Sequence, residues 1–144
     1  MVNKMGYPEK EQISKDLMAL PDHQDKFKYL IKKGKNQPEL NQEFKIEKFR
    51  IQGCMSKLWL HPQFKEGKIY FSSDSDAAIP KGIAAILTEI YSGLTPDEAL
   101  EFDSSFLKEV GVAQHLSMNR SNGLVKLYEQ IRLYALAFKS LNRG

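Results

Sequence analysis

The sequence predicts an α+β fold, in which helices pack on one face of a small antiparallel three-stranded sheet. Apolar residues recur at helical spacing in the first third of the chain and again in its second half. In between, they alternate with polar residues, as they do in half-buried strands. Helices on both sides of a short run of strands are typical of an α+β domain. At 144 residues the chain fits a single domain, residues 1–144.

Two helices are expected in the first third. The first ends at Pro21, and its inward positions are Ile13, Leu17 and Leu20. The second follows Asp22, which can cap it, and fades at Gly34; its inner face is Phe27, Leu30 and Ile31. The lysines of this segment alternate with apolar residues, so they are interpreted as the solvated face of an amphipathic helix.

Three short strands are expected in the middle. The first covers residues 44–51, where the alternation slips once and suggests a bulge. The second and third cover residues 58–61 and 69–71, and the segment Pro62–Gly67 supplies the turn between them. Together these segments predict a small antiparallel sheet.

The second half of the chain is expected to be helical. Residues 77–91 are apolar on most sides, which predicts a buried central helix. Thr95 and Glu98 have capping-box spacing, with Pro96 at the first helical position. A short helix around Phe106, Leu107 and Val110 comes next. The last helix carries one apolar stripe: Leu124, Leu127, Tyr128, Ile131, Tyr134, Ala135, Phe138 and Leu141.

Composition excludes several function classes. The net charge of +3 is small and scattered, which argues against nucleic-acid binding. No run approaches the roughly 20 apolar residues of a membrane span, and the first residues lack the apolar segment of a signal peptide. The single cysteine has no partner for an internal disulfide. The expectation is therefore a cytoplasmic protein.

Candidate sites for metal or phosphate are weak. Three histidines and one cysteine are spread along the chain without paired spacing, whereas zinc takes three or four protein ligands. No metal site is therefore predicted. The glycines stand singly, so no phosphate-binding loop is predicted either.

Cys54 and Arg120 are the two candidates for chemistry. Cys54 follows Gly53 just before a predicted strand. At such a position a side chain can be exposed to a partner and still be held in a defined place by the strand. On the residues alone it is either a reactive thiol or a small buried apolar side chain. Arg120 precedes the last helix, which Ser121 or Asn122 can cap. It is either a solvated arginine or a positive charge held near a thiolate.

Three blocks carry a family resemblance. Residues 51–60, read as IQGCMSKLWL, resemble the cysteine-loop signature of the SufE/CsdE family of sulfur acceptors in iron–sulfur cluster assembly. Residues 73–82 (SDSDAAIPKG) and 114–124 (QHLSMNRSNGL) resemble two further blocks of that family, in the same order. The likeness covers nearly the whole chain and implies a SufE/IscU-like fold.

The resemblance implies a function. Cys54 would accept sulfur as a persulfide from a PLP-dependent cysteine desulfurase of the SufS/CsdA type, activate that enzyme, and pass the sulfur to a cluster-assembly scaffold. PLP would belong to the desulfurase, so no cofactor is expected on this chain. Arg120 is the candidate stabiliser of the thiolate. The residues implied in partner binding or in the cysteine loop are Gln52, Gly53, Met55, Ser56, Asp76 and His115.

Two other hypotheses stay open. The first is an iron–sulfur scaffold, although clusters are held mainly by several cysteine thiolates and this chain has one. The second is a non-catalytic adaptor in which Cys54 is a structural core residue.

Overall fold

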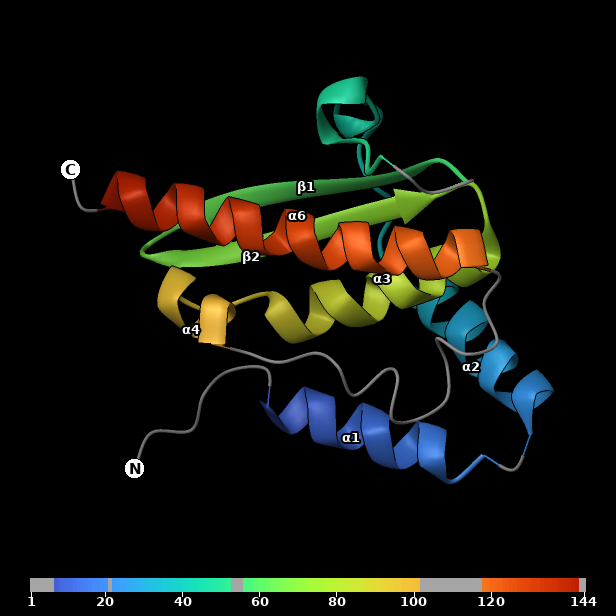
Figure 1. The fold of residues 1–144 in the computed structure, drawn as a ribbon. Helices are drawn as coiled ribbons and strands as arrows, with labels where there is room; N and C mark the ends of the chain where they lie inside the picture. Colours follow the sequence, from blue (N-terminus) through green and yellow to red (C-terminus); the bar gives the residue numbers. More distant parts are fainter. Residues whose placement is uncertain (1–6, 21, 53–55, 102–117, 143–144) are drawn as a thin grey trace.

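The computed structural model describes residues 7–20, 22–52, 56–101 and 118–142, together with the side chains of these residues except those of 7–10, 23, 118–125 and 142. Figure 1 shows the elements in chain order. They are α1 (Tyr7–Met18), α2 (His23–Asn36), the short 3₁₀ turns η1 (Gln42–Phe44) and η2 (Glu47–Phe49), β1 (Leu58–Lys65), β2 (Lys68–Ser75), α3 (Ala78–Tyr91), α4 (Pro96–Glu101) and α6 (Met118–Asn142).

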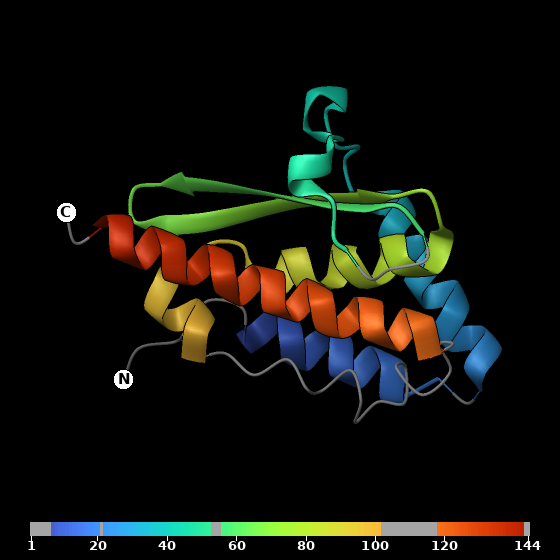
Figure 2. The ribbon, with the colours of Figure 1, turned by 45° about the horizontal axis from the view of Figure 1, so that its top comes forward.

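The architecture is α+β, with the helices on one face of the sheet. Figures 1 and 2 show α3 and α6 under the two strands, with α1 beyond α3 and α2 crossing α3 near one end. The two 3₁₀ turns lie on the opposite face of the sheet (Figure 2). In the described part of the chain the sheet has two antiparallel strands, so the prediction of three strands is wrong.

The predicted strand over residues 44–51 forms η1 and η2 instead. An isolated bridge between Arg50 and Trp59 pairs the end of this segment with β1. The alternation of apolar and polar residues did not indicate a strand here, because the apolar side chains of Phe44 and Phe49 do not lie on one face of a strand. Both instead pack on the ring of His61. The apolar residue between them, Ile46, is 46% exposed.

The β1–β2 hairpin is longer than predicted, and its turn is shorter. The register runs from Leu58↔Ser75 to Lys65↔Lys68, which leaves Glu66 and Gly67 as a two-residue turn. Both have positive φ, 51° and 80°, as a type I′ turn requires. Pro62, expected in the turn, lies within β1. The Leu58 carbonyl accepts a hydrogen bond from Ile51, outside the hairpin, so the backbone groups of alternate residues in β1, including Pro62, face away from β2.

Helix α2 begins as predicted but ends later. Asp22 caps it: one carboxylate oxygen accepts a hydrogen bond from the Asp25 amide at 2.9 Å. The helix does not end at Gly34 but continues to Asn36. Gly34 instead faces Gly82, because a Cβ added at Gly34 would lie 3.1 Å from the Gly82 amide nitrogen. These two glycines mark the close crossing of α2 over α3.

The core lies between the sheet and the helices. α3 is buried along most of its length, as predicted for residues 77–91. The α6 stripe is confirmed at Leu127, Ile131 and Ala135, which are at most 1% exposed, but not at Leu141, which is 72% exposed. The largest fully buried side chains are Ile13, Leu17, Leu30, Leu60, Ile69, Ile86, Leu87, Ile90, Leu94 and Leu127.

The capping box at α4 is confirmed. The Glu98 carboxylate accepts from the Thr95 amide at 2.9 Å, and the Thr95 hydroxyl accepts from the Glu98 amide at 3.2 Å. α4 is fixed to α6 by Arg132, which donates to the Leu100 carbonyl at 2.8 Å. The short helix predicted around Phe106, Leu107 and Val110 lies outside the described residues.

Candidate functional site

Cys54, the candidate sulfur acceptor, lies outside the described residues, but the residues on both sides of its segment are described. Gly53, Cys54 and Met55 are the undescribed positions, flanked by Gln52 and Ser56. Beyond these flanking residues, the chain is fixed in the core on each side. Ile51 and Leu58 are each 3% exposed, and the Ile51 amide donates to the Leu58 carbonyl at 2.8 Å. The two ends of the chain that flank the Cys54 segment are therefore held together by buried residues and a backbone hydrogen bond. We call this pair of fixed ends, at Ile51 and Leu58, the backbone frame.

The block 73–76 holds the second end of this segment. The Asp76 carboxylate accepts a hydrogen bond from the Lys57 amide at 2.9 Å. The Lys57 carbonyl in turn accepts from the Asp76 amide at 3.1 Å and from the Ser75 hydroxyl at 2.6 Å. Both backbone polar groups of Lys57 are thus satisfied by β2 and the residue after it, which fixes the chain three residues after Cys54.

Asp74 is a buried charge beside this frame, and sequence reasoning assigned it no role in the site. Its side chain is 6% exposed and lies 3.0 Å from the Lys45 ammonium and 3.5 Å from that of Lys81. The Ser75 amide donates to the same carboxylate at 2.8 Å. Burial alone would raise the pKa of Asp74, but the hydrogen bonds from Lys45 and Ser75 and the charges of the two lysines outweigh it, so that the pKa lies below its ordinary value.

We expect the stability that Asp74 contributes to depend on pH and to be lost in acid. Because its folded pKa is lowered, the contribution is present above the unfolded pKa and is lost as pH falls through the folded value, below about pH 4. Asp74→Asn should cost about 2 kcal/mol of unfolding free energy at pH 7, since two partly buried lysines lose their counter-ion. Urea unfolding at pH 7, 5 and 3 checks this. The difference between variant and wild type must shrink toward pH 3, and a constant difference would contradict the assignment.

The face of the sheet opposite the helices carries an aromatic cluster of Phe44, Phe49 and His61. The rings of Phe44 and His61 stack with centroids 3.7 Å apart, and Phe49 meets His61 edge-on at 4.8 Å. Burial lowers the pKa of His61, although the nearby Glu43 charge opposes this. The cluster holds η1 and η2 against β1, and the chain that leaves η2 leads directly to Gln52. The exposed Gln52 amide donates to Glu47 of η2 at 3.3 Å.

The remaining predicted site residues are only partly placed. Arg120 is the third residue of α6, so its backbone is helical, while its side chain lies outside the description. The expectation that Ser121 or Asn122 caps the helix is wrong, because α6 begins at Met118. Met118, Asn119 and Arg120 include neither proline nor glycine, so nothing in them stops the helix from extending upstream. His115 lies outside the described residues.

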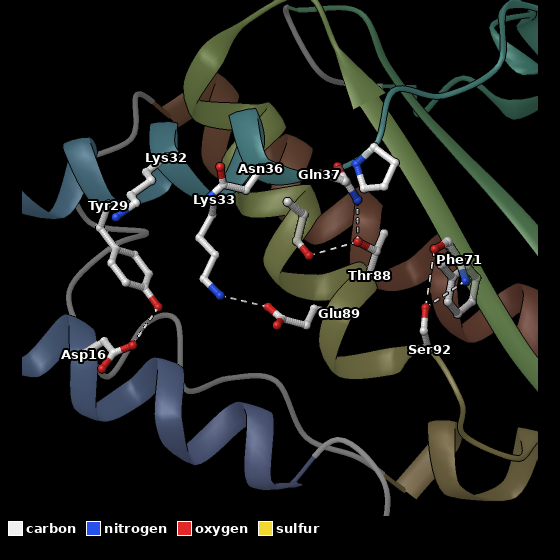
Figure 3. A pocket seen from close by; sticks show the side chains of 12 residues that line it. Asp16, Tyr29, Lys32, Lys33, Asn36, Gln37, Phe71, Thr88, Glu89 and Ser92 are labelled. Carbon is white, nitrogen blue, oxygen red and sulfur yellow. Dashed lines mark hydrogen bonds and ion pairs between the residues drawn. The ribbon is translucent and has the colours of Figure 1, made fainter.

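A pocket of about 560 Å³ lies elsewhere in the molecule. Its walls come from α1, α2 and the residues that follow α2, and from β2 and α3 (Figure 3). None of the predicted site residues whose side chains the structure describes (Gln52, Ser56 and Asp76) lines it. No sequence pattern indicated it, because its lining comes from segments separated by up to about half of the chain.

The described ranges hold neither a metal-binding cluster nor a membrane span. Residues 7–20, 22–52, 56–101 and 118–142 contain no group of three or more His, Cys, Asp or Glu side chains placed to hold a metal ion. Within the same ranges, no helix has both the length and the apolar character needed to span a membrane.

Comparison with known proteins identifies the family. The solution structure of a hypothetical protein from Thermus thermophilus is similar in fold, with a TM-score of 0.73 and 20% sequence identity over 90% of this chain and 95% of that one. The family model described as "SufE: Fe-S metabolism associated domain" matches residues 11–135. The chain therefore belongs to the SufE family, whose domain implies a role in iron–sulfur metabolism.

Proposed function

We propose that this protein is a sulfur acceptor and activator of a PLP-dependent cysteine desulfurase of the SufS/CsdA type. Cys54 is the only cysteine of the chain, and it falls in a segment whose two ends are fixed by the Ile51–Leu58 and Lys57–Asp76 hydrogen bonds. That frame, in a member of a family associated with iron–sulfur metabolism, is the observation that carries the proposal. It supports a short segment that can be presented to a partner without disturbing the core.

The proposed chemistry is transpersulfuration. The Cys54 thiolate attacks the outer sulfur of a persulfide on the desulfurase, a new sulfur–sulfur bond forms on Cys54, and the bond within the donor persulfide breaks. The donor cysteine leaves as a thiolate, so the exchange is redox-neutral and needs no other reactant. PLP and the carbon–sulfur cleavage belong to the desulfurase. The sulfur then passes to a cluster-assembly scaffold, and we place the pathway in the cytoplasm.

Activation of the thiol is the role proposed for Arg120. A thiol of ordinary pKa, about 8.5, is only a few per cent thiolate at neutral pH. The backbone of Arg120 lies in the first turn of the 25-residue helix α6, where the helix dipole is positive. A guanidinium at this end would add its own charge and favour a thiolate brought close to it on docking.

The test of the function is direct observation of the sulfur. After incubation with a cysteine desulfurase, PLP and cysteine, intact mass spectrometry should show about one added sulfur per chain. The addition should be removed by dithiothreitol, and peptide mapping should place it on Cys54. An unmodified mass, under conditions in which the desulfurase turns over, would contradict the proposal.

Arg120→Ala should lower the activation of the desulfurase about 10-fold, because a tenfold change corresponds to about 1.4 kcal/mol, the scale of one favourable charge interaction. The measurement is sulfide release under saturating cysteine, with Arg132→Ala as the matched control. Arg132 lies on the same helix, where it donates to Leu100. Equal rates for Arg120→Ala and wild type would remove Arg120 from the site.

Asp76 is proposed to contribute to docking as well as to the frame, and the two roles can be separated. Asp76→Asn keeps an oxygen that can accept from the Lys57 amide but removes the charge, whereas Asp76→Ala removes both. Asp76→Arg reverses the charge and should weaken binding to the desulfurase most. If Asp76→Asn binds the desulfurase like the wild type and only Asp76→Ala binds more weakly, Asp76 acts through the backbone frame alone.

A further inference from the structure

The pocket noted above has the size and composition of a small-molecule site. Its volume of about 560 Å³ falls within the range of roughly 300–1,000 Å³ that ligand pockets occupy. One wall is α2, which contributes Tyr29, Lys32, Lys33 and Asn36 (Figure 3). The opposite wall and the floor come from α3 and β2.

The acidic groups that border the pocket are already engaged. Asp16 accepts from the Tyr29 hydroxyl at 3.2 Å with one oxygen and from Gln12 at 2.8 Å with the other. Glu89 forms an ion pair with Lys33 at 3.0 Å. Burial and the neighbouring Asp16 charge raise the pKa of Tyr29, so its hydroxyl stays protonated and remains a donor to that carboxylate. Glu89 is therefore paired with an ammonium group, whereas the two donors to Asp16 are neutral.

Hydrogen-bond donors on α2 remain unused. Lys32 and Asn36 are four residues apart, on one face of the helix, and both line the pocket. Neither has a hydrogen bond or an ion pair with another described residue. Lys33 pairs with Glu89, which occupies one of its three ammonium hydrogens. The exposed side chains of Lys32 and Asn36 thus offer an ammonium and an amide donor at this wall, to which an anionic ligand can bind.

The floor of the pocket is apolar. Phe71 and Ala85 are each 6% exposed and line the pocket with Pro38. Thr88, also in the lining, uses its hydroxyl in bonds to Gln37 at 2.8 Å and to the Ala85 carbonyl at 2.9 Å. A ligand that fills the site would therefore place an apolar body against Phe71 and Ala85, with its charge at the α2 wall.

The charge of the ligand is limited by the helix itself. Lys33 and Asn36 belong to the last turn of α2, where the helix dipole is negative, so a doubly charged group such as phosphate is disfavoured more than a singly charged one. A carboxylate carries one charge and two acceptor oxygens, which match one ammonium and one amide donor. We propose that this pocket binds a small organic carboxylate, held by Lys32 and Asn36 and packed by its apolar body on Phe71 and Ala85.

Benzoate is the probe that tests this, because it joins a carboxylate to a flat apolar ring. Added to the full-length protein, it should shift the backbone amide NMR signals of Phe71, Ala85 and Ser92 in a saturable way. Benzamide, the neutral analogue of the same shape, should bind at least about 10-fold more weakly, since a charge-assisted hydrogen bond contributes on this scale. Inorganic phosphate should not shift these signals.

Variants complete the test. Lys32→Gln should weaken benzoate binding about 10-fold, and Lys32→Arg should restore most of it. The matched control is Lys28→Gln, which removes the same charge one turn earlier on α2, outside the lining, and should bind like the wild type. Equal binding of benzoate and benzamide, equal binding by Lys32→Gln, or no saturable shift in the wild type would each overturn the proposal.

This inference does not depend on sulfur transfer. The residues proposed to hold benzoate take no part in the proposed sulfur chemistry, so Cys54→Ser should bind benzoate unchanged. Failure of the carboxylate site would leave the sulfur-acceptor proposal untouched, and failure of the sulfur-acceptor proposal would leave this one testable.

Discussion

Cys54→Ser is expected to abolish the uptake of sulfur and the stimulation of the desulfurase together. A serine hydroxyl is scarcely ionised at neutral pH and is a far weaker nucleophile toward sulfur than a thiolate, so the transfer rate should fall more than about 100-fold. The substitution replaces a single sulfur atom with oxygen and leaves the rest of the chain unchanged. Sulfide or alanine release by the desulfurase, measured with and without this protein, reports the stimulation, and intact mass reports the uptake.

The control must show that the fold survives. Ser72→Ala, a change of similar size at an exposed position of β2, should keep its stimulation, and both variants should unfold at the wild-type urea midpoint. Thiol labelling of the native wild type with a small and a bulky reagent, alone and with the desulfurase, tests the adaptor hypothesis separately. A Cys54→Ser variant that stimulates as well as the wild type would end the acceptor hypothesis, and a cysteine that stays unlabelled in the complex would favour a structural role.

Local signals in the sequence predicted the helices well. Asp22 and the Thr95–Glu98 pair cap helices because a cap needs only residues three positions apart, so the pattern can be read without tertiary structure. The buried helix α3 was predicted for a similar reason, since a segment that is apolar on most sides has to be enclosed. The family resemblance likewise depends on residues that are contiguous in the chain, and the family match confirmed it.

Features that depend on distant contacts were missed or misread. The alternation over residues 44–51 predicted a strand, but the rings of Phe44 and Phe49 pack on His61 more than ten residues away, and two 3₁₀ turns result. The ion pair of Asp74 left no local signal in the sequence, because its partner Lys45, just after η1, is 29 positions earlier. The pocket could not be foreseen for the same reason.

Gly34 illustrates the limit most clearly. A glycine near the end of a helical pattern is typical of a helix end, and the sequence was interpreted so. The structure gives it another reason: α2 continues, and the absence of a side chain lets it approach α3 at Gly82. A sequence pattern on one helix does not reveal which second helix comes close.

Gly82→Ala is therefore expected to destabilise the protein by at least about 3 kcal/mol. In an isolated helix the same change would stabilise by about 1 kcal/mol, because alanine is the better helix former. Here the added Cβ would overlap the Leu30 carbonyl oxygen and lie 2.5 Å from its carbonyl carbon and 3.0 Å from its Cα. All three are backbone atoms of α2, so no side-chain rotation relieves the contact and the two helices must separate.

Urea unfolding followed by circular dichroism measures the effect, and Gly67→Ala is the matched control. Gly67 has open space around it, with nothing within 4 Å of an added Cβ, but its φ of +80° disfavours alanine. Its cost should be about 1 kcal/mol, the penalty of the left-handed conformation alone. The free energy of unfolding should thus be slightly lower for Gly67→Ala than for the wild type, and far lower for Gly82→Ala than for Gly67→Ala. A Gly82→Ala variant as stable as the wild type would mean that helix propensity prevails at this position, and that α2 and α3 do not cross with their backbones in contact.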